Sequence, residues 1–266
     1  MLQFVFKITN KIFSIRNSFF TPRIKVLPNK LSFITLGSEY GKKTICTDYL
    51  PENSNIISAG IGEDISFDVE IANLTNGLII MIDPTPRAIN HFENFIESFN
   101  NDRKTMYSNN GKQDIESYDT SGLSSDRFKL YPKALWKNEN DIFFYAPLNE
   151  DHVSHSAIDI QKTKNKKKAI HVKSVTLKKV MDDYSIEKLD LLKLDIEGAQ
   201  LEVLNSAFKN KIFPTQIILE IDELNFPSLK SFIRARRMLR LMKKNDYLLI
   251  SKSDGFDLTY VHNLNT

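Results

Sequence analysis

The spacing of hydrophobic positions changes from that of a strand to that of a helix between residues 189 and 208. Residues Leu189–Leu194 form an apolar run of strand length, interrupted by two charged residues. The next hydrophobic positions recur at helical spacing, at Leu201, Leu204, Ala207 and Phe208. Gly198 lies at the switch between the two periods. The pattern predicts a strand, a turn and a helix, and it places Asp195 and Glu197 at the carboxyl end of the strand, where ligands bind in open α/β sheets.

The same patterns predict strands and helices in alternation along most of the chain. Short apolar runs predict strands at residues 55–59, 78–82, 128–133, 142–146, 171–177 and 216–222. The strand at 171–177 is expected at an edge of its sheet. A helical period predicts helices at residues 65–74, 87–99, 178–184 and 228–244, the first of them with Asp64 as its N-cap. Hairpins are predicted at residues 31–50 and, around Asp254-Gly255, at residues 247–262. This order indicates an α/β domain whose sheet ends in an antiparallel pair of strands.

The composition indicates a globular domain without an internal disulfide. The chain has 266 residues, of which 41% are hydrophobic and 26% are charged, and this length can bury a full core. The formal net charge of +3 is too small to indicate nucleic acid as the main partner. The single cysteine, Cys46, fits a reducing compartment, and no apolar run reaches the roughly 18 residues of a spanning helix. We therefore expect a cytoplasmic enzyme.

Residues 1–36 differ from residues 37–266, which we expect to form the catalytic domain. No acidic residue occurs before Glu39, and hydrophobic residues are interleaved with six basic ones, Lys7, Lys11, Arg16, Arg23, Lys25 and Lys30. Two of these lysines break the apolar stretch that a secretory signal would need. Two interpretations stay open: the segment packs on the domain with its basic side in solvent, or it lies on the anionic inner face of a membrane. A second basic run, Lys162–Lys168, is predicted to be a solvated loop. The basic residues of the helix at 228–244, Arg234 among them, are predicted to lie on a solvated face.

Two glycines and an aspartate follow the first two predicted strands of the main sheet. Gly60 and Gly62 come directly after the strand at 55–59 and let the backbone approach a nucleotide without an intervening Cβ. Asp83, 21 residues after Gly62, ends the next strand, where a carboxylate can accept hydrogen bonds from both ribose hydroxyls. Ile65 stands where the dinucleotide fingerprint has its third glycine. These residues predict a nucleoside site at the edge of the sheet.

Three longer motifs contain these residues. They are Gly60-Ile-Gly62-Glu-Asp-Ile-Ser-Phe-Asp68, Asp83-Pro-Thr-Pro86 and Leu192-Lys-Leu-Asp195-Ile-Glu-Gly198-Ala. In their order and spacing, over residues 37–262, the chain resembles the FkbM-type methyltransferases, which use S-adenosylmethionine. The resemblance implies the class I methyltransferase fold: a Rossmann-like, doubly wound, mostly parallel seven-stranded sheet with a C-terminal antiparallel hairpin. It also implies methylation of a hydroxyl, often on a sugar of a polysaccharide or on a secondary metabolite. The residues that it places beside the cofactor are Gly60, Gly62, Glu63, Asp83, Pro84 and Asp195.

The chemistry of such a reaction suggests roles for the carboxylates. A hydroxyl is too weak an acid to be ionised at neutral pH, so a base must take its proton as the new bond forms, or a metal must lower its pKa. Asp195 is the first candidate as base or substrate anchor, with Glu197 and Glu220 in support. Asp195 and Glu220 can instead hold a divalent cation such as Mg²⁺, or Asp195 can be the N-cap of the following helix. The sequence leaves these alternatives open.

Two other classes of protein fit part of the pattern. A nicotinamide-dependent Rossmann oxidoreductase also has a glycine loop and an acid at a strand end, but Ile65 and the acidic motif at Asp195 disfavour it. A non-catalytic nucleotide-binding module would keep the fold without turnover. The presence of Asp83, Asp195 and Glu197 argues against such a module.

Overall fold

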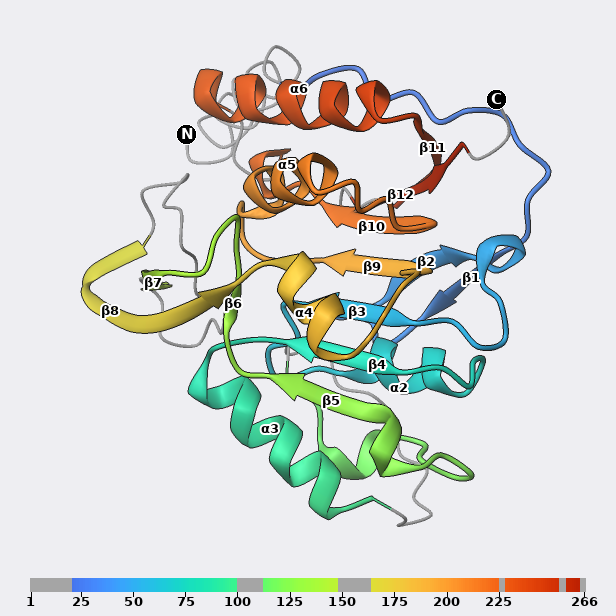
Figure 1. Cartoon of the computed structure of the whole chain (residues 1–266), viewed down its shortest axis with the longest axis vertical. Helices are drawn as coiled ribbons and strands as arrows, with labels where there is room; N and C mark the ends of the chain where they lie inside the picture. Colours follow the sequence, from blue (N-terminus) through green and yellow to red (C-terminus); the bar gives the residue numbers. More distant parts are fainter. Residues whose placement is uncertain (1–20, 100–111, 148–163, 225–227, 254–256, 264–266) are drawn as a thin grey trace, which may run out of the picture.

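Figure 1 shows a computed structural model of the chain. The structure describes residues 21–99, 112–147, 164–224, 228–253 and 257–263. The strands are β1 (Phe33–Leu36), β2 (Lys43–Cys46), β3 (Ile56–Ala59), β4 (Ile79–Ile82), β5 (Phe128–Tyr131), β6 (Ala134–Leu135), β7 (Asp141–Pro147), β8 (Lys164–Val175), β9 (Leu191–Leu194), β10 (Gln216–Glu220), β11 (Tyr247–Lys252) and β12 (Asp257–His262). The α-helices are α2 (Ser66–Ala72), α3 (Pro86–Glu97), α4 (Leu177–Asp183), α5 (Gln200–Lys209) and α6 (Leu229–Lys244). Short 3₁₀ turns lie at Thr47–Tyr49, Ile115–Ser117, Ser125–Arg127 and Asp222–Leu224.

Seven strands form one mixed sheet in the order β11-β12-β10-β9-β3-β4-β5 (Figure 1). The strands from β10 to β5 in this order are parallel to one another. β12 alone runs against its two neighbours, β10 and β11. The α/β class, the mostly parallel seven-stranded sheet and the C-terminal antiparallel hairpin are therefore confirmed.

Helices cover both faces of this sheet, because alternate residues of each strand point to opposite faces. Ile57 of β3 belongs to the core shared with α4, α5 and α6. Its neighbour Ile56 belongs to the core shared with α2, α3 and the β1–β2 hairpin. Every residue of β4 is buried, as the continuous apolar run at 78–82 predicted for a strand covered on both faces.

Helix α2 starts at Ser66, and the prediction that Asp64 caps it was wrong. The N-cap position is Ile65, whose side chain makes no capping hydrogen bond. One oxygen of Asp64 accepts the N–H of Ser66 at 3.0 Å and its hydroxyl at 2.6 Å, and the other accepts the hydroxyl of Ser38 at 2.6 Å. Asp64 thus joins the start of α2 to the turn between β1 and β2, a long-range contact that a local capping pattern does not indicate.

The predicted hairpin of β1 and β2 is confirmed. Its second strand, β2, packs against β10 and β12 of the large sheet. The side chain of Gln216 in β10 exchanges hydrogen bonds of 2.7 and 3.2 Å with the backbone of Cys46. The hydroxyl of Thr259 in β12 donates to the carbonyl of Thr44 at 2.7 Å. These bonds fix β2 over β10 and β12, so that Lys43, the first residue of β2, lies at the carboxyl end of β10.

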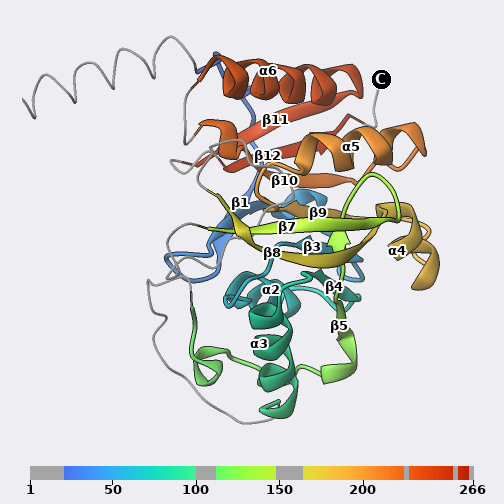
Figure 2. The same cartoon turned by 90° about the vertical axis from the view of Figure 1, so that its left-hand side faces the viewer.

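A three-stranded sheet in the order β6-β8-β7 lies at the carboxyl edge of the parallel strands (Figure 2). The lysine-rich run predicted as a loop belongs to β8 from residue 164 onward, and residues 162 and 163 lie outside the described residues. β8 pairs with β7 as far as Pro147 and Lys164, so backbone pairing overrides the polarity that suggested a loop. β8 also lies between β6 and β7, and it is therefore not the edge strand predicted at 171–177.

Part of the N-terminal segment packs on the domain. The N–H of Leu27 donates to the carbonyl of Leu249 in β11 at 2.9 Å, and the side chain of Asn29 donates to the next carbonyl of β11 at 3.0 Å. The division after residue 36 stays a prediction, with β1 before it and its partner β2 after it. Residues 1–20 lie outside the described residues. None of the described helices has both the length and the apolar character needed to cross a membrane.

Gly60 marks a very close approach between two strand ends at the carboxyl edge. It follows β3 with a φ of 82°. A Cβ on this residue would lie 1.7 Å from the carbonyl oxygen of Asp195, which follows β9. The ammonium of Lys193 donates to the carbonyl of Gly60 at 2.9 Å. Glycine is therefore required here for the packing of backbone against backbone, in addition to the predicted approach of a ligand.

We expect Gly60→Ala to lower the free energy of unfolding by at least about 3 kcal/mol, because the new methyl group meets a backbone atom that has no free space to move into. The control is Gly122→Ala. Gly122 has a similar φ of 77°, but a Cβ there would have no atom within 4 Å, so only the left-handed backbone penalty of roughly 1–2 kcal/mol applies. Urea denaturation measures both. Equal losses in the two variants would contradict a rigid contact at Gly60.

Candidate active site

A cavity of about 260 Å³ opens at the carboxyl edge of the sheet. The loops after β3, β4 and β9 line it, and β6 and β7 contribute the apolar side chains of Leu135 and Phe144. All the residues selected from the sequence line this cavity: Gly60, Gly62, Glu63, Asp83, Pro84, Asp195, Glu197 and Glu220. The structure thus brings the predicted nucleoside and acceptor residues into one place.

Negative charge predominates in the cavity wall. Its acidic residues are Glu63, Asp64, Asp83, Asp195, Glu197 and Glu220. Its basic residues are Lys43 and Lys193. A wall with this excess of carboxylates favours a ligand that carries positive charge.

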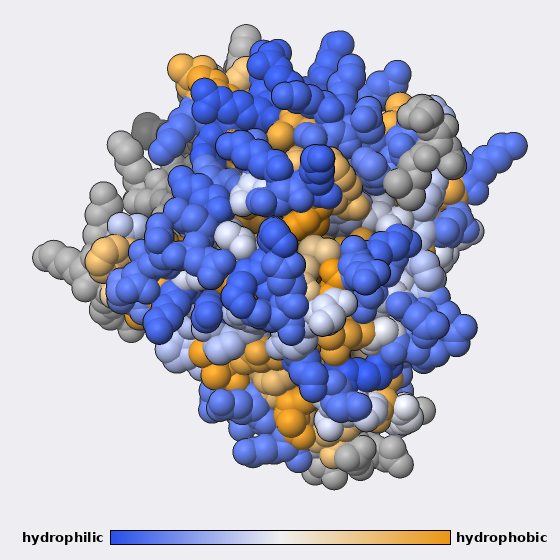
Figure 3. Space-filling view, in the orientation of Figure 1, coloured by the Kyte–Doolittle hydropathy of each residue, from blue (hydrophilic) through white to orange (hydrophobic). Residues whose placement is uncertain are grey.

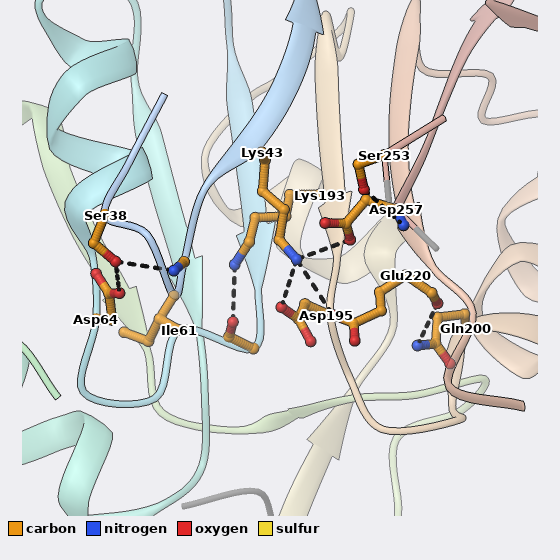
Figure 4. Close-up of polar contacts among 12 residues, drawn as sticks. Ser38, Lys43, Ile61, Asp64, Lys193, Asp195, Gln200, Glu220, Ser253 and Asp257 are labelled. Atoms are coloured by element: carbon orange, nitrogen blue, oxygen red, sulfur yellow. Dashed lines mark hydrogen bonds and ion pairs between the residues drawn. The ribbon is translucent and has the colours of Figure 1, made fainter. Parts of the chain in front are cut away.

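Lys43 holds three carboxylates together in this wall (Figure 4). Its ammonium lies 3.1 Å from Asp195, 3.2 Å from Glu220 and 2.9 Å from Asp257. The three carboxylates come from the ends of β9, β10 and β12, which are neighbours in the sheet. Lys43 is only 5% exposed. A buried ammonium and a group of converging carboxylates each need the other, because either alone would lose its hydration without compensation.

The cluster favours the charged forms of Lys43 and Asp195. Burial by itself would raise the pKa of Asp195, but the positive charges of Lys43 and Lys193 lower that pKa to about 2. Burial by itself would lower the pKa of Lys43, but the carboxylates around it raise that pKa well above its usual value. For Asp257, burial raises the pKa by more than the charge of Lys43 lowers it. At neutral pH the cluster therefore contains an ammonium beside an ionised Asp195.

Asp83 organises the glycine loop from the end of β4. One of its oxygens accepts the N–H groups of Ile61 and Gly62 at 3.2 and 3.1 Å. The other accepts the N–H and the hydroxyl of Thr85 at 2.9 and 2.7 Å. The carboxylate therefore fixes the loop after β3 against the turn after β4. Its contact with a ribose stays a prediction, and a ribose hydroxyl would have to share these oxygens with the protein donors.

Glu63 lies in the cavity wall with its carboxylate in ion pairs. Arg87, near the start of α3, contacts it, and the ammonium of Lys112 lies 3.7 Å away. The backbone carbonyl of Glu63 accepts the N–H of Gln113 at 2.9 Å. Glu63 therefore ties the glycine loop to α3 and to the segment after residue 111, and its predicted contact with the cofactor stays a prediction.

The loop between β9 and α5 is held in a strained form by α6. Glu197 and Gly198 have φ values of 51° and 87°, and for a residue other than glycine this conformation costs roughly 1–3 kcal/mol. Arg234 donates to the carbonyl of Gly198 at 2.7 Å. It also forms ion pairs with Glu202 at 3.0 Å and with Glu223 at 2.9 Å. The sequence pattern put Arg234 on a solvated helix face, but the structure makes it the residue that fixes this loop.

The alternative prediction that Asp195 caps the following helix was wrong, whereas a divalent cation between Asp195 and Glu220 stays a prediction. Helix α5 begins at Gln200 with Ala199 as its N-cap, so Asp195 does not cap the helix. The ammonium of Lys43 occupies the place between Asp195 and Glu220 that a divalent cation would take. Within the described residues, no three His, Cys, Asp or Glu side chains are grouped as metal ligands. The two carboxylates therefore need no metal to lie side by side.

Four residues of the site were missed in the sequence. Lys43 and Asp257 belong to the charged cluster, and Tyr40 lines the cavity. Burial, and then the negative charges of the wall, raise the pKa of Tyr40. Lys193 gave a signal that could have been used, because a charge inside a buried apolar run needs a partner. The other three could be found only from the way in which the hairpin and the last strand meet the sheet.

We expect Lys43→Met to lower the free energy of unfolding by about 3–5 kcal/mol at pH 7, because it leaves three partly buried carboxylates without their cation. The pKa of Asp195 is depressed in the folded protein, so its stabilising effect is present above the unfolded pKa of about 3.9 and is lost as the pH falls toward 2. Without Lys43 the carboxylates can take up protons at higher pH. The difference in the free energy of unfolding between wild type and Lys43→Met should therefore become smaller as the pH falls from 7 to about 4.

The matched control is the neighbouring residue. Lys42 pairs with Glu39 at the surface, where the two side chains are 48% and 70% exposed, so Lys42→Met should cost less than about 1 kcal/mol. Chemical denaturation at several pH values measures both variants. A loss for Lys43→Met that stayed constant between pH 7 and pH 4 would contradict the electrostatic account.

A family model matches the part of the chain that contains the motifs of this cavity. Residues 49–249 match the family described as "Methyltransferase FkbM domain". Among solved structures, the chain is similar to the methyltransferase FkbM from Methylobacillus flagellatus KT, with 10% identity and a TM-score of 0.45. That match covers 79% of this chain and 44% of the other chain, so this chain spans less than half of that protein's length. No curated protein matches this chain.

The family match extends over more than half of the chain and includes the glycine loop, Asp83 and the loop at Asp195. These are the three segments on which the resemblance was based, and they line one cavity. The chain belongs to the FkbM methyltransferase domain family.

Proposed function

We propose that the protein transfers a methyl group from S-adenosylmethionine to a hydroxyl of a small-molecule or glycan acceptor, on a sugar of a polysaccharide or on a secondary metabolite. Membership of the family supplies the reaction class and implies this cofactor. The observation that carries the choice of a hydroxyl is the pair of carboxylates, Asp195 and Glu220, that Lys43 holds in the wall of the cavity.

The residues of the cavity fit the cofactor. S-adenosylmethionine carries a sulfonium and an ammonium group, which suit a wall rich in carboxylates. We assign Gly60, Gly62, Asp83 and Pro84 to its nucleoside, with Glu63 fixing the loop behind them. When bound, it supplies a methyl group on a good leaving group, so the task of the protein is alignment rather than covalent catalysis.

Asp195 and Glu220 then bind and orient the acceptor. The side chain of Asp195 is 30% exposed, so a hydroxyl in the cavity can reach it. Its carboxylate accepts a hydrogen bond from the acceptor hydroxyl and directs a lone pair of the oxygen toward the methyl group. Lys43 keeps this carboxylate ionised and in place.

The low pKa of Asp195 is compatible with a role as proton acceptor. The acceptor oxygen gains positive charge as its bond to the methyl carbon forms and the bond from carbon to sulfur breaks. Its proton then becomes strongly acidic, so a weak base suffices to remove it. The negative charge of Asp195 also stabilises the positive charge that develops on the oxygen. Asp195 thus acts as anchor first and as base late in the reaction.

The two rival classes receive less support. The family match favours a methyltransferase over a nicotinamide-dependent oxidoreductase. A non-catalytic module would gain nothing from an ionised, partly exposed Asp195 that needs a buried lysine to stabilise it. Measured turnover with any acceptor distinguishes this module from an enzyme.

We expect Asp83→Ala to weaken S-adenosylmethionine binding by about 10- to 150-fold, because it removes charge-assisted hydrogen bonds to the ribose and frees the loop at Gly62. Calorimetry measures the affinity. Thr85→Val is the control, since it removes a hydroxyl that donates to Asp83 but keeps the carboxylate, and its affinity should stay near that of the wild type. Unchanged affinity in a folded Asp83→Ala protein would contradict the assignment.

We expect Asp195→Asn to reduce turnover by about 10²–10⁴-fold with cofactor affinity nearly intact, because it keeps the shape of the side chain but removes its basicity. Asp190→Asn is the matched control at the other end of β9. Asp190 accepts the N–H of Asn55 at 3.1 Å and pairs with Lys188, so its loss should lower stability and leave turnover unchanged. Methyl transfer is screened over sugar nucleotides and glycans. Near wild-type turnover in Asp195→Asn would overturn the proposed role.

A further inference from the structure

Helix α6 exposes a face that contains no acidic residue. Six basic residues are exposed on this face: Lys230, Arg236, Arg237, Arg240, Lys243 and Lys244. Two large hydrophobic residues, Leu229 and Ile233, are 62% and 42% exposed among them. At about 3.6 residues per turn, the eight positions fall within an arc of roughly 140°. We call these eight residues the α6 face. Figure 3 shows the top of the molecule, over α6, as mostly hydrophilic with hydrophobic residues at its upper left.

The basic residues of the α6 face lack acidic partners in the part of the chain that the structure describes. The ion pairs of α6 there are those of Arg234, which points to the loop at Gly198 rather than outward. A solvated helix surface usually places opposite charges three or four residues apart. Basic side chains that neighbour one another without acids repel, and an anionic partner would remove this repulsion.

The basic N-terminal segment enters the described structure beside the α6 face (Figure 2). Residues 21–23 line a groove together with Arg236, Arg240 and Lys243. The preceding residues, 1–20, include three basic residues, no acidic residue and five phenylalanines. Residues 21–23, among them Arg23, therefore add a basic residue beside the α6 face from a distant part of the sequence.

We propose that the α6 face binds the surface of an anionic lipid bilayer. Lipid headgroups match the positive charge, and the hydrocarbon below them takes up exposed apolar side chains such as Leu229 and Ile233. A nucleic acid would match the charge but would leave these apolar side chains in water. The combination of the two residue types favours the bilayer.

The test is cosedimentation of the full chain with vesicles of phosphatidylcholine that contain about 30% phosphatidylglycerol, and with vesicles of phosphatidylcholine alone. We expect binding to the anionic vesicles only, weakening steeply as salt rises from about 0.1 M to 0.5 M. Arg236→Gln, Arg240→Gln and Lys243→Gln, combined in one variant, should reduce the partition coefficient by about 100-fold, or roughly fivefold per charge.

A matched variant removes three charges elsewhere, through Lys129→Gln, Lys137→Gln and Lys173→Gln. This variant should keep most of its binding to anionic vesicles. An equal reduction of the partition coefficient in both triple variants would show that binding does not depend on the α6 face, and would overturn the proposal. Thermal melting checks that both variants are folded.

Two further measurements separate the bilayer from other partners. Leu229→Ser with Ile233→Ser should weaken vesicle binding while keeping its dependence on salt, because apolar contact is lost and charge is retained. Equal binding to vesicles of phosphatidylcholine alone would contradict a charge-driven surface. Tight binding to duplex DNA or to inorganic polyphosphate, without vesicle binding at the same salt concentration, would identify a soluble polyanion and overturn the proposal.

Discussion

The structure of the candidate active site depends on one buried ammonium group. Lys43 lies among Asp195, Glu220 and Asp257 at distances of 2.9–3.2 Å, and the carboxylates come from three strands that are neighbours in the sheet. β9 and β10 end at the same edge of the sheet where the antiparallel strand β12 begins, so the three acids at that edge would repel one another without a cation. The hairpin of β1 and β2, fixed across β10 and β12 by Gln216 and Thr259, supplies this cation. A segment ahead of the residues that match the family thus completes the acidic site.

A second constraint is steric, and it acts on the loop that carries Asp195. The carbonyl of Asp195 packs so closely on Gly60 that no side chain fits between them. On the other side, Arg234 holds the carbonyl of Gly198, and Glu197 adopts a left-handed conformation. The loop is therefore fixed at both ends, and its strain is sustained by packing at one end and by a buried ion-pair cluster at the other. Such a loop can hold a carboxylate in place for a reaction that depends mainly on alignment.

The sequence predicted the elements that local patterns determine. Strands covered on both faces, such as β4, give continuous apolar runs, and the change of period at Gly198 is enough to place Asp195 at a strand end. Features set by long-range contact were missed or misassigned. Nothing near Lys43 indicates that a lysine in an amphipathic hairpin is buried, because its partners lie roughly 150 to 215 residues away along the chain. Likewise, the lysines of β8 have the polarity of a loop, but pairing with β7 makes them part of a strand. Arg234 has the spacing of a solvated position, although its partners on other elements hold it inward.

The central claim is that Lys43 and Lys193 keep Asp195 ionised, and it can be measured without knowing the acceptor. NMR titration of the side-chain carboxyl carbon in full-length protein labelled at aspartate, with the signal of Asp195 assigned by its absence in Asp195→Asn, gives the pKa of this group directly. The account predicts a midpoint well below the value of about 3.9 for an unperturbed aspartate, so the signal should not titrate between pH 8 and about 4. A midpoint at or above about 3.9 would contradict the account, because burial would then outweigh the two lysines.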